Sequence, residues 1–544
     1  MRILAYTNFL VFSLCLFIIS CNNPDWLNTS TFSVDEYKNN LKILSNDSMQ
    51  GRMPGTEGGM RAANYIASQF KKYGLTTISN GSYFQQVNIY SKQPDYKKTS
   101  IVFSGKTFKE RITPFDEIVF ISNLEKNMVH IESDLVFVGY GIVAPEYNWD
   151  DYKNADVKDK IVVCLFNHPD FMRHDYKKGQ TTYYGTFHSK SETAFRKGAK
   201  GIMFIFQKDC IFQFPKLQNV IKNMSFGDYS LDSKIDLISF IKEETFDRVL
   251  QNLKMNTDDL VKKANNRNFH PYPMSMELNA SFKQNTNNFT SPNIVGYIKG
   301  TEHPDEAIIY MAHYDHFGVL RPEKGDSIYN GAIDNASGTA GIISLAQYFS
   351  THPQKRTIIF VATTAEEMTF QGVLHYIMNP VIPLEKTIAG INLDMMNFLG
   401  KNDSIELKPI AFTDAMEPLK QLTANENLGM KLSKSDNEYL TFRFESYPFA
   451  LHDVLVMNIA FEQIPKKYTS LSDDQLNTII KEGGLNNHTP FDEVKPWFSY
   501  GGILQELELA KQIGLYFAND GVKPKFNTDN PYLPAKKMWI RKEY

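Results

Sequence analysis

The stretch Ala307–Ala336, AIIYMAHYDHFGVLRPEKGDSIYNGAIDNA, decides the fold that the sequence predicts. Its apolar start, residues 307–312, has the length of an interior β-strand. His313, Asp315 and His316 follow at once, and each is a possible metal ligand or base. Alternate residues of an extended chain face the same side, so the side chains of His313 and Asp315 can point at one site. A single His or Asp after a strand is often an ordinary loop residue, so the interpretation depends on the rest of the chain.

The end of the same stretch predicts the start of a helix. The run DNASG, residues 334–338, is typical of a turn and cap, because Asn and Ser accept hydrogen bonds from the free amides of a helix N-terminus. The predicted helix, ASGTAGIISLAQYFS, covers residues 336–350. Asp334 therefore stands in the loop just before this helix.

From Asn293 onward, buried-strand patterns alternate with helical ones. The predicted strands are NIVGYI (293–298), AIIYMA (307–312), TIIFVAT (357–363), TIAGINLDM (387–395) and VLVMNIAF (454–461). Continuous apolar strands with helices between them favour a sheet that is covered on both faces. The predicted fold class is therefore α/β, with a mostly parallel mixed sheet flanked by helices.

Possible metal ligands follow these predicted strands at or soon after their carboxyl ends. They are, in chain order, His313, Asp315, Asp334, Glu366, Glu367, Asp394 and His488. Open parallel sheets bind ligands beyond the carboxyl ends of their strands. We therefore expect these side chains to form one site.

The residue types in this set indicate metal chemistry. Imidazole and carboxylate ligands suit zinc, and one carboxylate can be shared by two ions. The adjacent Glu366 and Glu367 need not act alike, because one can bind metal while the other takes a proton from water. A Glu-Glu pair is usually a solvated helix start, but that explanation does not cover candidates on successive strand ends. No cysteine joins the set, which argues against a cysteine-zinc site or an iron–sulfur cluster.

Length and composition exclude some other classes of protein. A chain of 544 residues is longer than one hydrophobic core usually supports, so two or more domains are expected. The net charge of -3 gives no reason to expect a nucleic acid as partner. The four cysteines predict no disulfide framework, and Cys164 lies in an apolar run as a small buried side chain.

The first 20 residues have the pattern of a secretory signal. Arg2 precedes the apolar run NFLVFSLCLFIIS, which is too short for a permanent membrane anchor. The run ends in IISC, residues 18–21, which resembles the bacterial lipoprotein processing signal and implies cleavage before Cys21 and lipid on its thiol. We expect a protein held by lipid in a bacterial cell envelope, on the periplasmic side or the cell surface; a plain secreted protein is the alternative.

Changes of pattern along the chain predict its domain organisation. A loop, GRMPGTEGG (51–59), separates two predicted helices within residues 33–74; it lacks the Lys-Ser/Thr ending of a phosphate-binding loop and is interpreted as a turn. Short β-rich runs between about residues 99 and 206 differ from the alternating strands and helices beyond residue 293 and predict an inserted domain. The predicted segments are a signal peptide (1–20), a lipid-anchored tether (21–32), the main domain in two parts (33–95 and 286–520), the insert (96–285) and a tail (521–544).

Several strings together resemble a known enzyme family. AHYDHFG, YNGAIDNASGTAG, ATTAEE, NLDM and HTPFDEV are similar to those of the co-catalytic di-zinc aminopeptidases of the bacterial leucyl aminopeptidase and plasma carboxypeptidase type. The resemblance covers about residues 33–90 and 293–519, while DLVFVGYGI and AFRKGAKGIMFIF resemble the β-rich protease-associated domain often inserted in such enzymes. The resemblance implies the zinc exopeptidase fold, two zinc ions, and removal of N-terminal residues from peptide substrates.

The resemblance also implies how the ligands divide between two ions. Asp334 would bridge the two zinc ions. His313 and Asp394 would complete one site, and Glu367 and His488 would complete the other.

Two further roles come from the same resemblance. Glu366 would be the general base, and Asp315 would orient His313 from behind. A strained peptide bond would follow the bridging aspartate, at Asp334–Asn335.

The run RFESYPF, residues 443–449, departs from the Ser-Asp-His that many relatives carry before Tyr-Pro-Phe. Glu445 either meets a substrate amine or is a surface acid. His316 lies beside the predicted site but is interpreted, like the other histidines outside the ligand set, as a structural or surface residue.

Two alternatives to an active di-zinc peptidase are considered. A glutaminyl cyclase has the same fold with one zinc, and the presence of His313 argues against it. A catalytically inactive binding ectodomain would be expected to lack metal ligands, whereas all of the candidates are present here.

Overall fold

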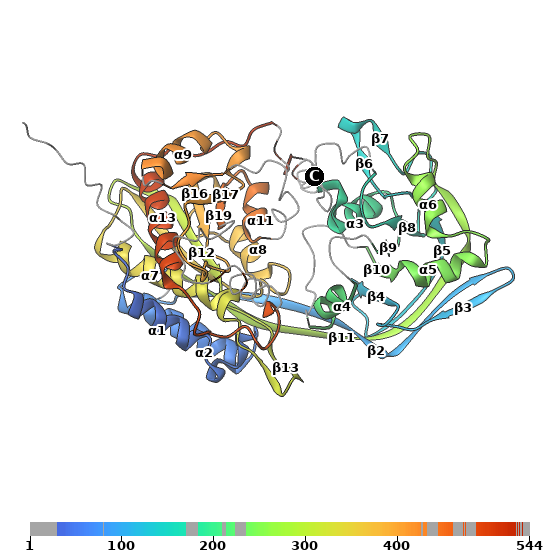
Figure 1. The fold of residues 1–544 in the computed structure, drawn as a ribbon, viewed down its shortest axis with the longest axis horizontal. Coiled ribbons are helices and arrows are strands. Elements are labelled where there is room, and N and C mark those ends of the chain that lie inside the picture. The colour runs from blue at the N-terminus through green and yellow to red at the C-terminus, as the bar shows by residue number, and fades with distance from the viewer. Residues whose placement is uncertain are drawn as a thin grey trace, which may run out of the picture.

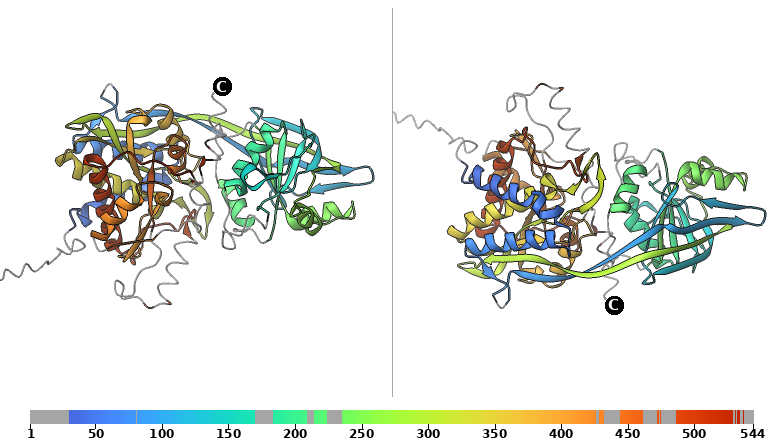
Figure 2. Two further views of the ribbon diagram at one scale, coloured as in Figure 1. Left: turned by 90° about the horizontal axis from the view of Figure 1, so that it is seen from above. Right: turned by 90° about the horizontal axis from the view of Figure 1, so that it is seen from below.

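Two long antiparallel strands, β2 (Phe84–Gly105) and β11 (Tyr272–Ile298), connect two lobes of the molecule (Figure 1). They remain paired from Phe84 opposite Ile294 to Gly105 opposite Met276. Both further views show them running together along one side of the molecule (Figure 2). The domain borders expected at 95/96 and 285/286 fall inside these two strands. We call residues 92–286 the insert lobe and the remainder the main lobe.

The computed structural model describes most of the chain. The described residues are 30–79, 81–169, 183–208, 214–223, 235–425, 428–431, 444–460, 486–528 and the isolated positions 472, 474, 530, 532, 533 and 536. The expected signal peptide and the Cys21 processing site lie outside these residues. Among the described residues, no helix is both long and apolar enough to span a membrane.

The sheet of the main lobe is mostly parallel. Its order is β18–β17–β19–β16–β12–β15–β11. The bounds are β12 His303–His313, β15 Arg356–Thr363, β16 Thr387–Asn392, β17 Ser404–Lys408, β18 Gly429–Met430 and β19 Val456–Ala460. β12 runs parallel to β15 and β16, and β16 runs parallel to β19, while β11 and β17 are antiparallel to their neighbours β15 and β19. The predicted fold class is confirmed, and NIVGYI is the end of the much longer β11.

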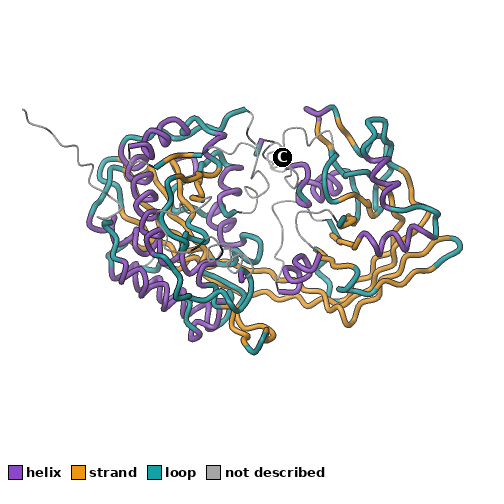
Figure 3. Tube along the Cα trace, in the orientation of Figure 1, coloured by secondary structure: helices purple, strands orange, loops and turns teal. Residues whose placement is uncertain are grey.

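Helices cover both faces of this sheet (Figure 3). The helices of one face pack on Ile308 and Tyr310 of β12, and those of the other face pack on the alternate residues Ile309 and Met311. The first face carries α1 (Val34–Leu44), α2 (Glu57–Lys72), α7 (Ser337–Thr351) and α13 (Tyr500–Asn519), and the second carries α8 (Gln371–Met378) and α11 (Ser446–Leu451). A further helix, α9 (Met416–Asn425), packs against α13. The helices predicted within residues 33–74 and over residues 336–350 are confirmed.

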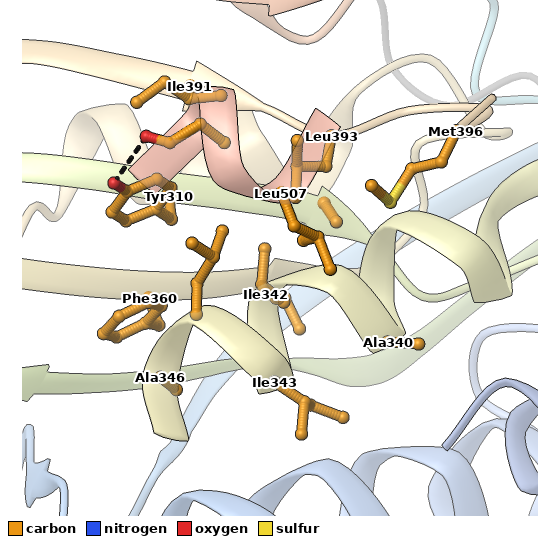
Figure 4. Close-up of a cluster of buried hydrophobic side chains, with 14 of the residues drawn as sticks. Tyr310, Ala340, Ile342, Ile343, Ala346, Phe360, Ile391, Leu393, Met396 and Leu507 are labelled. Carbon is orange, nitrogen blue, oxygen red and sulfur yellow. Dashed lines mark hydrogen bonds between the residues drawn. The ribbon is translucent and has the colours of Figure 1, made fainter. Parts of the chain in front are cut away.

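Tyr310 is central to the core of the first face (Figure 4). Its ring stacks on that of Phe360, with 5.6 Å between the centroids, and its hydroxyl donates to the carbonyl of Ala510 at 2.9 Å. A Cβ on Gly514 would lie 1.7 Å from this hydroxyl, so only glycine allows α13 to approach so closely. This packing fixes β12, whose end carries His313.

The insert lobe has an α/β core of its own. β5 (Met128–Phe137), β8 (Ile161–Leu165), β9 (Gly201–Phe206) and β10 (Leu237–Lys242) are parallel neighbours, and β4 (Ile118–Ser122) closes the edge antiparallel to β10. Apolar clusters fill both faces, with α4 (Phe214–Asn223) on one face and α5 (Glu243–Gln251) and α6 (Thr257–Ala264) on the other. The remaining elements are α3 (Phe187–Arg196), β3 (Lys109–Ile112), β6 (Val143–Ala144) and β7 (Trp149–Asp150) here, and β1 (Thr76–Thr77), β13 (Gly318–Glu323) and β14 (Asp326–Tyr329) in the main lobe. The insert therefore contains more helix than the β-rich pattern predicts, and its resemblance to a protease-associated domain stays a prediction.

Asp151 makes the stability of the insert lobe depend on pH. Its carboxylate is fully buried and accepts hydrogen bonds from the amides of Tyr140 and Ile142 at 3.2 and 2.9 Å. Burial raises the pKa of Asp151 from 3.8 to about 7. A raised pKa means that the folded state holds the proton more tightly than the unfolded state. The stability from this proton is complete below pH 4 and is lost as the pH rises through about 7.

Asp151→Asn is expected to flatten this pH dependence, because Asn keeps an oxygen for the two amides and cannot ionise. The free energy of unfolding of the wild type should fall relative to that of the variant between pH 5 and pH 8, by on the order of 3 kcal/mol at most, and its melting temperature should fall with it. Thermal unfolding across this range measures the difference. Parallel curves for the two proteins would contradict the prediction.

Candidate metal centre

The parallel strands bring the predicted ligands to one edge of the sheet. β12 ends at His313, and β15 and β16 end shortly before Glu366 and Asp394 respectively. Asn335 links the loops, because its side chain donates to the carbonyl of Leu393 and accepts from the amide of Gly338, both at 2.9 Å. The loop that carries Asp334 is thereby held beside the end of β16.

Asp334 places one carboxylate oxygen in each of two groups of donor atoms. In the first group, Nε2 of His313 lies 3.1 Å from Oδ1 of Asp334 and 3.5 Å from Oδ1 of Asp394. In the second, Nε2 of His488 lies 3.1 Å from Oδ2 of Asp334 and 3.5 Å from Oε2 of Glu367. The structure thus brings all five sequence-predicted ligands together around Asp334. The donor atoms of His313, Asp334 and Asp394 form one group, and those of His316, Asp334 and Glu367 form another beside His488.

These distances fit zinc. Two donors that each lie about 2.0–2.1 Å from one tetrahedral ion are separated by about 3.3 Å. The donors are imidazole nitrogens and carboxylate oxygens, which suit zinc in its catalytic sites. Both clusters are mostly buried, so the protein holds these donors in place through its own packing.

The electrostatics of the centre favour a bound cation. Burial alone would lower the pKa of His313, but the carboxylates around it, Glu366 and Asp334 foremost, raise that pKa well above its ordinary value. Burial would raise the pKa of Asp334, but its hydrogen bonds with His313 and His488 hold that pKa well below its ordinary range. A metal ion can supply the positive charge that the proton on His313 otherwise supplies.

The carboxylate of Asp315 contacts both His313 and the turn that carries the Glu pair. Its carboxylate lies 3.8 Å from Nδ1 of His313, and it accepts hydrogen bonds from the amides of Glu366 and Glu367 at 3.1 and 3.4 Å. The sequence predicts only the contact with His313. The structure adds that the same carboxylate orients the turn that carries the Glu pair. The peptide bond between Asp334 and Asn335 is cis.

His316, interpreted from the sequence as an ordinary structural histidine, is in direct contact with a predicted ligand. It is buried, and its Nδ1 lies 2.9 Å from Oε1 of Glu367, whose other oxygen faces His488. Its ring fits against Gly331, where a Cβ would lie 2.6 Å from the ring. An imidazole that donates to one carboxylate oxygen leaves the other free to bind metal.

Variants of His316 test this orienting role. His316→Ala is expected to weaken the ion held by Glu367 and His488 by about 10–100-fold, because Glu367 loses its hydrogen-bond partner. His316→Asn, whose amide can stand near Nδ1, should bind zinc more tightly than His316→Gln, whose amide stands near Nε2. Zinc titration measures the order, and equal affinity in all three variants would exclude the Nδ1 contact.

Comparison with known proteins identifies the part of the chain that builds this centre. Residues 293–494 match the family described as Peptidase family M28. The match covers the second part of the main lobe. The M28 segment contains every predicted metal ligand, from His313 to His488.

Several M28-like relatives share parts of the sequence. Aminopeptidase YwaD from Bacillus subtilis is 27% identical over 265 residues, which is 47% of this chain and 44% of that protein. A probable zinc metalloprotease from Pyrenophora tritici-repentis is 35% identical over 104 residues, or 19% of this chain and 24% of that protein. The matched segments span less than half of the length of these curated relatives. A solved aminopeptidase from Aneurinibacillus sp. strain AM-1 has the same fold, with a TM-score of 0.52, 18% identity, and coverage of 92% of this chain and 97% of that one.

These findings support the predicted similarity to zinc aminopeptidases for the part of the chain that they match. The number of zinc ions and the role of each residue stay predictions. The lipoprotein signal and the protease-associated resemblance of the insert also stay predictions.

Glu445, at the departure from the pattern expected of M28 relatives, is buried and is not a surface acid. Its Oε2 accepts a hydrogen bond from the hydroxyl of Thr363 at 2.9 Å, at the end of β15. Its Oε1 has no hydrogen-bond partner among the described residues. Burial raises the pKa of Glu445 to about 8. The departure therefore adds another buried carboxyl group beside the metal centre.

Sequence reasoning missed Asp492, which also belongs to the M28 segment. Its buried carboxylate accepts hydrogen bonds from the amide of Ile333 at 2.9 and 3.2 Å and from that of Asp334 at 3.0 Å. The amide of Ala332 donates to the carbonyl of Asp492 at 3.0 Å. The only signal in the sequence was the position of Asp492 within HTPFDEV, four residues after His488.

Proposed function

We propose that this protein is a zinc-dependent aminopeptidase that removes N-terminal residues from peptides. The observation that carries the proposal is Asp334, which contributes one oxygen to each of two donor groups, with Glu366 beside them. The match of residues 293–494 to Peptidase family M28 and the aminopeptidase names of relatives support the reaction class.

The five predicted ligands would hold two zinc ions, which when bound would lower the pKa of a water molecule and polarise the peptide carbonyl. His313 and Asp394 would hold one ion, Glu367 and His488 would hold the other, and Asp334 would serve both. Asp315 would keep the ring of His313 in place, and it would hold the amides of the Glu pair, so that the base stays beside the ligands.

Glu366 would move the proton in the reaction. Its Oε2 lies 4.0 Å from Nε2 of His313, and its side chain is mostly buried, with 15% of its surface exposed. It would take a proton from the attacking water and return it to the nitrogen of the leaving amine.

The proposal is tested with purified protein, a set of aminoacyl fluorogenic substrates and metal analysis. We expect turnover of substrates with a free N-terminus, about two zinc ions per chain, and loss of activity on chelation with recovery on addition of zinc. The same substrates with a blocked N-terminus serve as the control. Zinc content near zero in carefully prepared protein would reject the di-zinc centre, and cyclisation of N-terminal glutamine without hydrolysis would favour a glutaminyl cyclase.

We also propose that Cys21 carries lipid and holds the protein in a bacterial cell envelope. The support is the IISC run after the apolar segment. Palmitate labelling of the expressed protein should be lost in Cys21→Ala, and unchanged labelling would contradict the proposal.

A further inference from the structure

Arg52 is a buried cation that bonds only to backbone carbonyls among the described residues. Its side chain is 0% exposed. Nε donates to the carbonyl of Tyr314 at 2.7 Å, Nη1 to those of Leu44 and Asn330 at 2.8 and 2.5 Å, and Nη2 to that of Gly331 at 2.9 Å. Buried charges usually pair with an opposite charge because desolvation is costly. A buried guanidinium that donates to neutral carbonyls instead of a carboxylate therefore indicates that it holds these carbonyls in place.

These carbonyls belong to the two loops that carry metal ligands. Tyr314 lies between His313 and Asp315, and Asn330 and Gly331 lead into the loop of Asp334. One planar guanidinium with a rigid fork of donors thus fixes the end of β12 relative to the bridging aspartate.

Asp492 holds the second loop from the other side. Arg52 binds the carbonyls of residues 330 and 331, and the carboxylate of Asp492 binds the amides of residues 333 and 334. The amide of residue 332 donates to the backbone carbonyl of Asp492. The cation therefore binds carbonyl oxygens and the anion binds amide N–H groups within the segment of residues 330–334. Asp334 stands at the end of this segment.

The N-terminal part of the chain is shaped to deliver Arg52 to this place. Gln50, Gly51 and Arg52 all lie in the left-handed region, with φ of 48°, 61° and 52°. A Cβ on Gly51 would lie 2.5 Å from the carbonyl oxygens of Gly318 and Tyr329, so glycine is required for this close approach. The run GRMPG, interpreted from the sequence as a turn, therefore also places a cation behind the metal centre.

Burial lowers the pKa of Arg52 to about 10, and the acids of the centre, Asp492 and Asp315 foremost, limit the decrease. Arg52 thus stays charged at neutral pH. Loss of its charge would strengthen the binding of metal cations, whereas loss of its hydrogen bonds would weaken it by releasing the loops. A change to Lys keeps the charge and removes the fork, so it isolates the second effect.

We propose that Arg52 is a positioning residue of the metal centre, which holds the loops of His313 and Asp334 in their ligand arrangement before metal binds. The inference rests on the metal ligands of the proposed function but not on peptide hydrolysis.

Arg52→Lys is compared with Arg356→Lys, both in the Glu366→Gln background, which removes turnover. Arg356 is a matched control because it also donates to two backbone carbonyls, those of Phe517 and Gly521, at 2.6 and 2.8 Å. It stands at the start of β15, whose other end faces the metal centre. Both variants should lower the melting temperature of the metal-free protein.

Competition with a chromophoric chelator measures the zinc dissociation constant of each variant. We expect Arg52→Lys to weaken zinc binding by about 10–100-fold and Arg356→Lys to leave it unchanged. Equal zinc affinity in Arg52→Lys and the parent, or equal weakening in both variants, would overturn the proposal. A parent protein that binds no zinc would instead reject the proposed function itself.

If Arg52→Lys does not fold without metal, its folding is followed as zinc is added, because binding to the native state is linked to folding. The proposal expects folding at a zinc concentration about 10–100-fold higher than for Arg356→Lys. Folding of both variants at the same zinc concentration would overturn it.

Discussion

Glu366→Gln is expected to reduce kcat for hydrolysis of aminoacyl substrates by about 10²–10⁴-fold, with zinc content unchanged. Glu366 is the member of the Glu pair whose carboxylate stands 4.0 Å from Nε2 of His313, farther than the other carboxylates of that group. Burial, with Glu367 and Asp394 nearby, raises the pKa of Glu366 well above its ordinary value. Bound cations would favour the ionised form of this carboxyl group, which is the form that accepts a proton from water. Glutamine has the same shape and cannot accept the proton.

Steady-state kinetics and metal analysis of the same preparation check this result. Glu493→Gln is the control, because Glu493 is 43% exposed and pairs with Lys495 at 2.9 Å, apart from the ligand set. Turnover that survives in Glu366→Gln would remove the base assignment. Loss of zinc together with turnover would show that Glu366 is a ligand and not the base.

Asp334→Asn is expected to abolish activity and to lower zinc occupancy to at most about one ion per chain. Its two oxygens lie 3.1 Å from Nε2 of His313 and 3.1 Å from Nε2 of His488, one for each donor group. Asparagine keeps a single neutral oxygen, so it cannot serve both groups. Metal ions contribute several kcal/mol of transition-state stabilisation, so the loss of turnover should be on the order of 10³-fold or more.

Chelation and reconstitution separate this effect from misfolding. Wild-type protein that has been stripped of metal should recover activity when zinc is returned, whereas folded Asp334→Asn should bind at most about one zinc and recover none. Circular dichroism confirms the fold of the variant. Two tightly bound zinc ions in Asp334→Asn would exclude a bridging role for this residue.

The main lobe could be predicted because its signals are local. Each apolar run between 293 and 461 became a strand, and parallel strands present their carboxyl ends at one edge. Ligands that follow different strands must then meet, whatever loops intervene. This reasoning predicted that the candidate side chains form one site, without knowledge of any distance. They are His313, Asp334, Glu366, Glu367, Asp394 and His488.

The same local reasoning was wrong for His316. Alternation along a strand predicts that it faces away from His313 and Asp315, but the rule holds only while the chain is extended. β12 ends at His313, so the next residues follow loop geometry, and His316 turns towards Glu367. The connecting strands were missed for a related reason, since β2 and β11 contain polar stretches that are stabilised by pairing with each other.

The sequence by itself predicted the fold class, the similarity to zinc aminopeptidases and the candidate ligands, because these depend on residue patterns within single strands and loops. Only the tertiary structure decided which groups stand behind the ligands. In the sequence, Arg52 lies in a predicted turn, Asp492 lies in a predicted loop, and Glu445 could be a surface acid. Their roles come from contacts with residues up to 279 positions away, and such contacts exist only when the chain is folded.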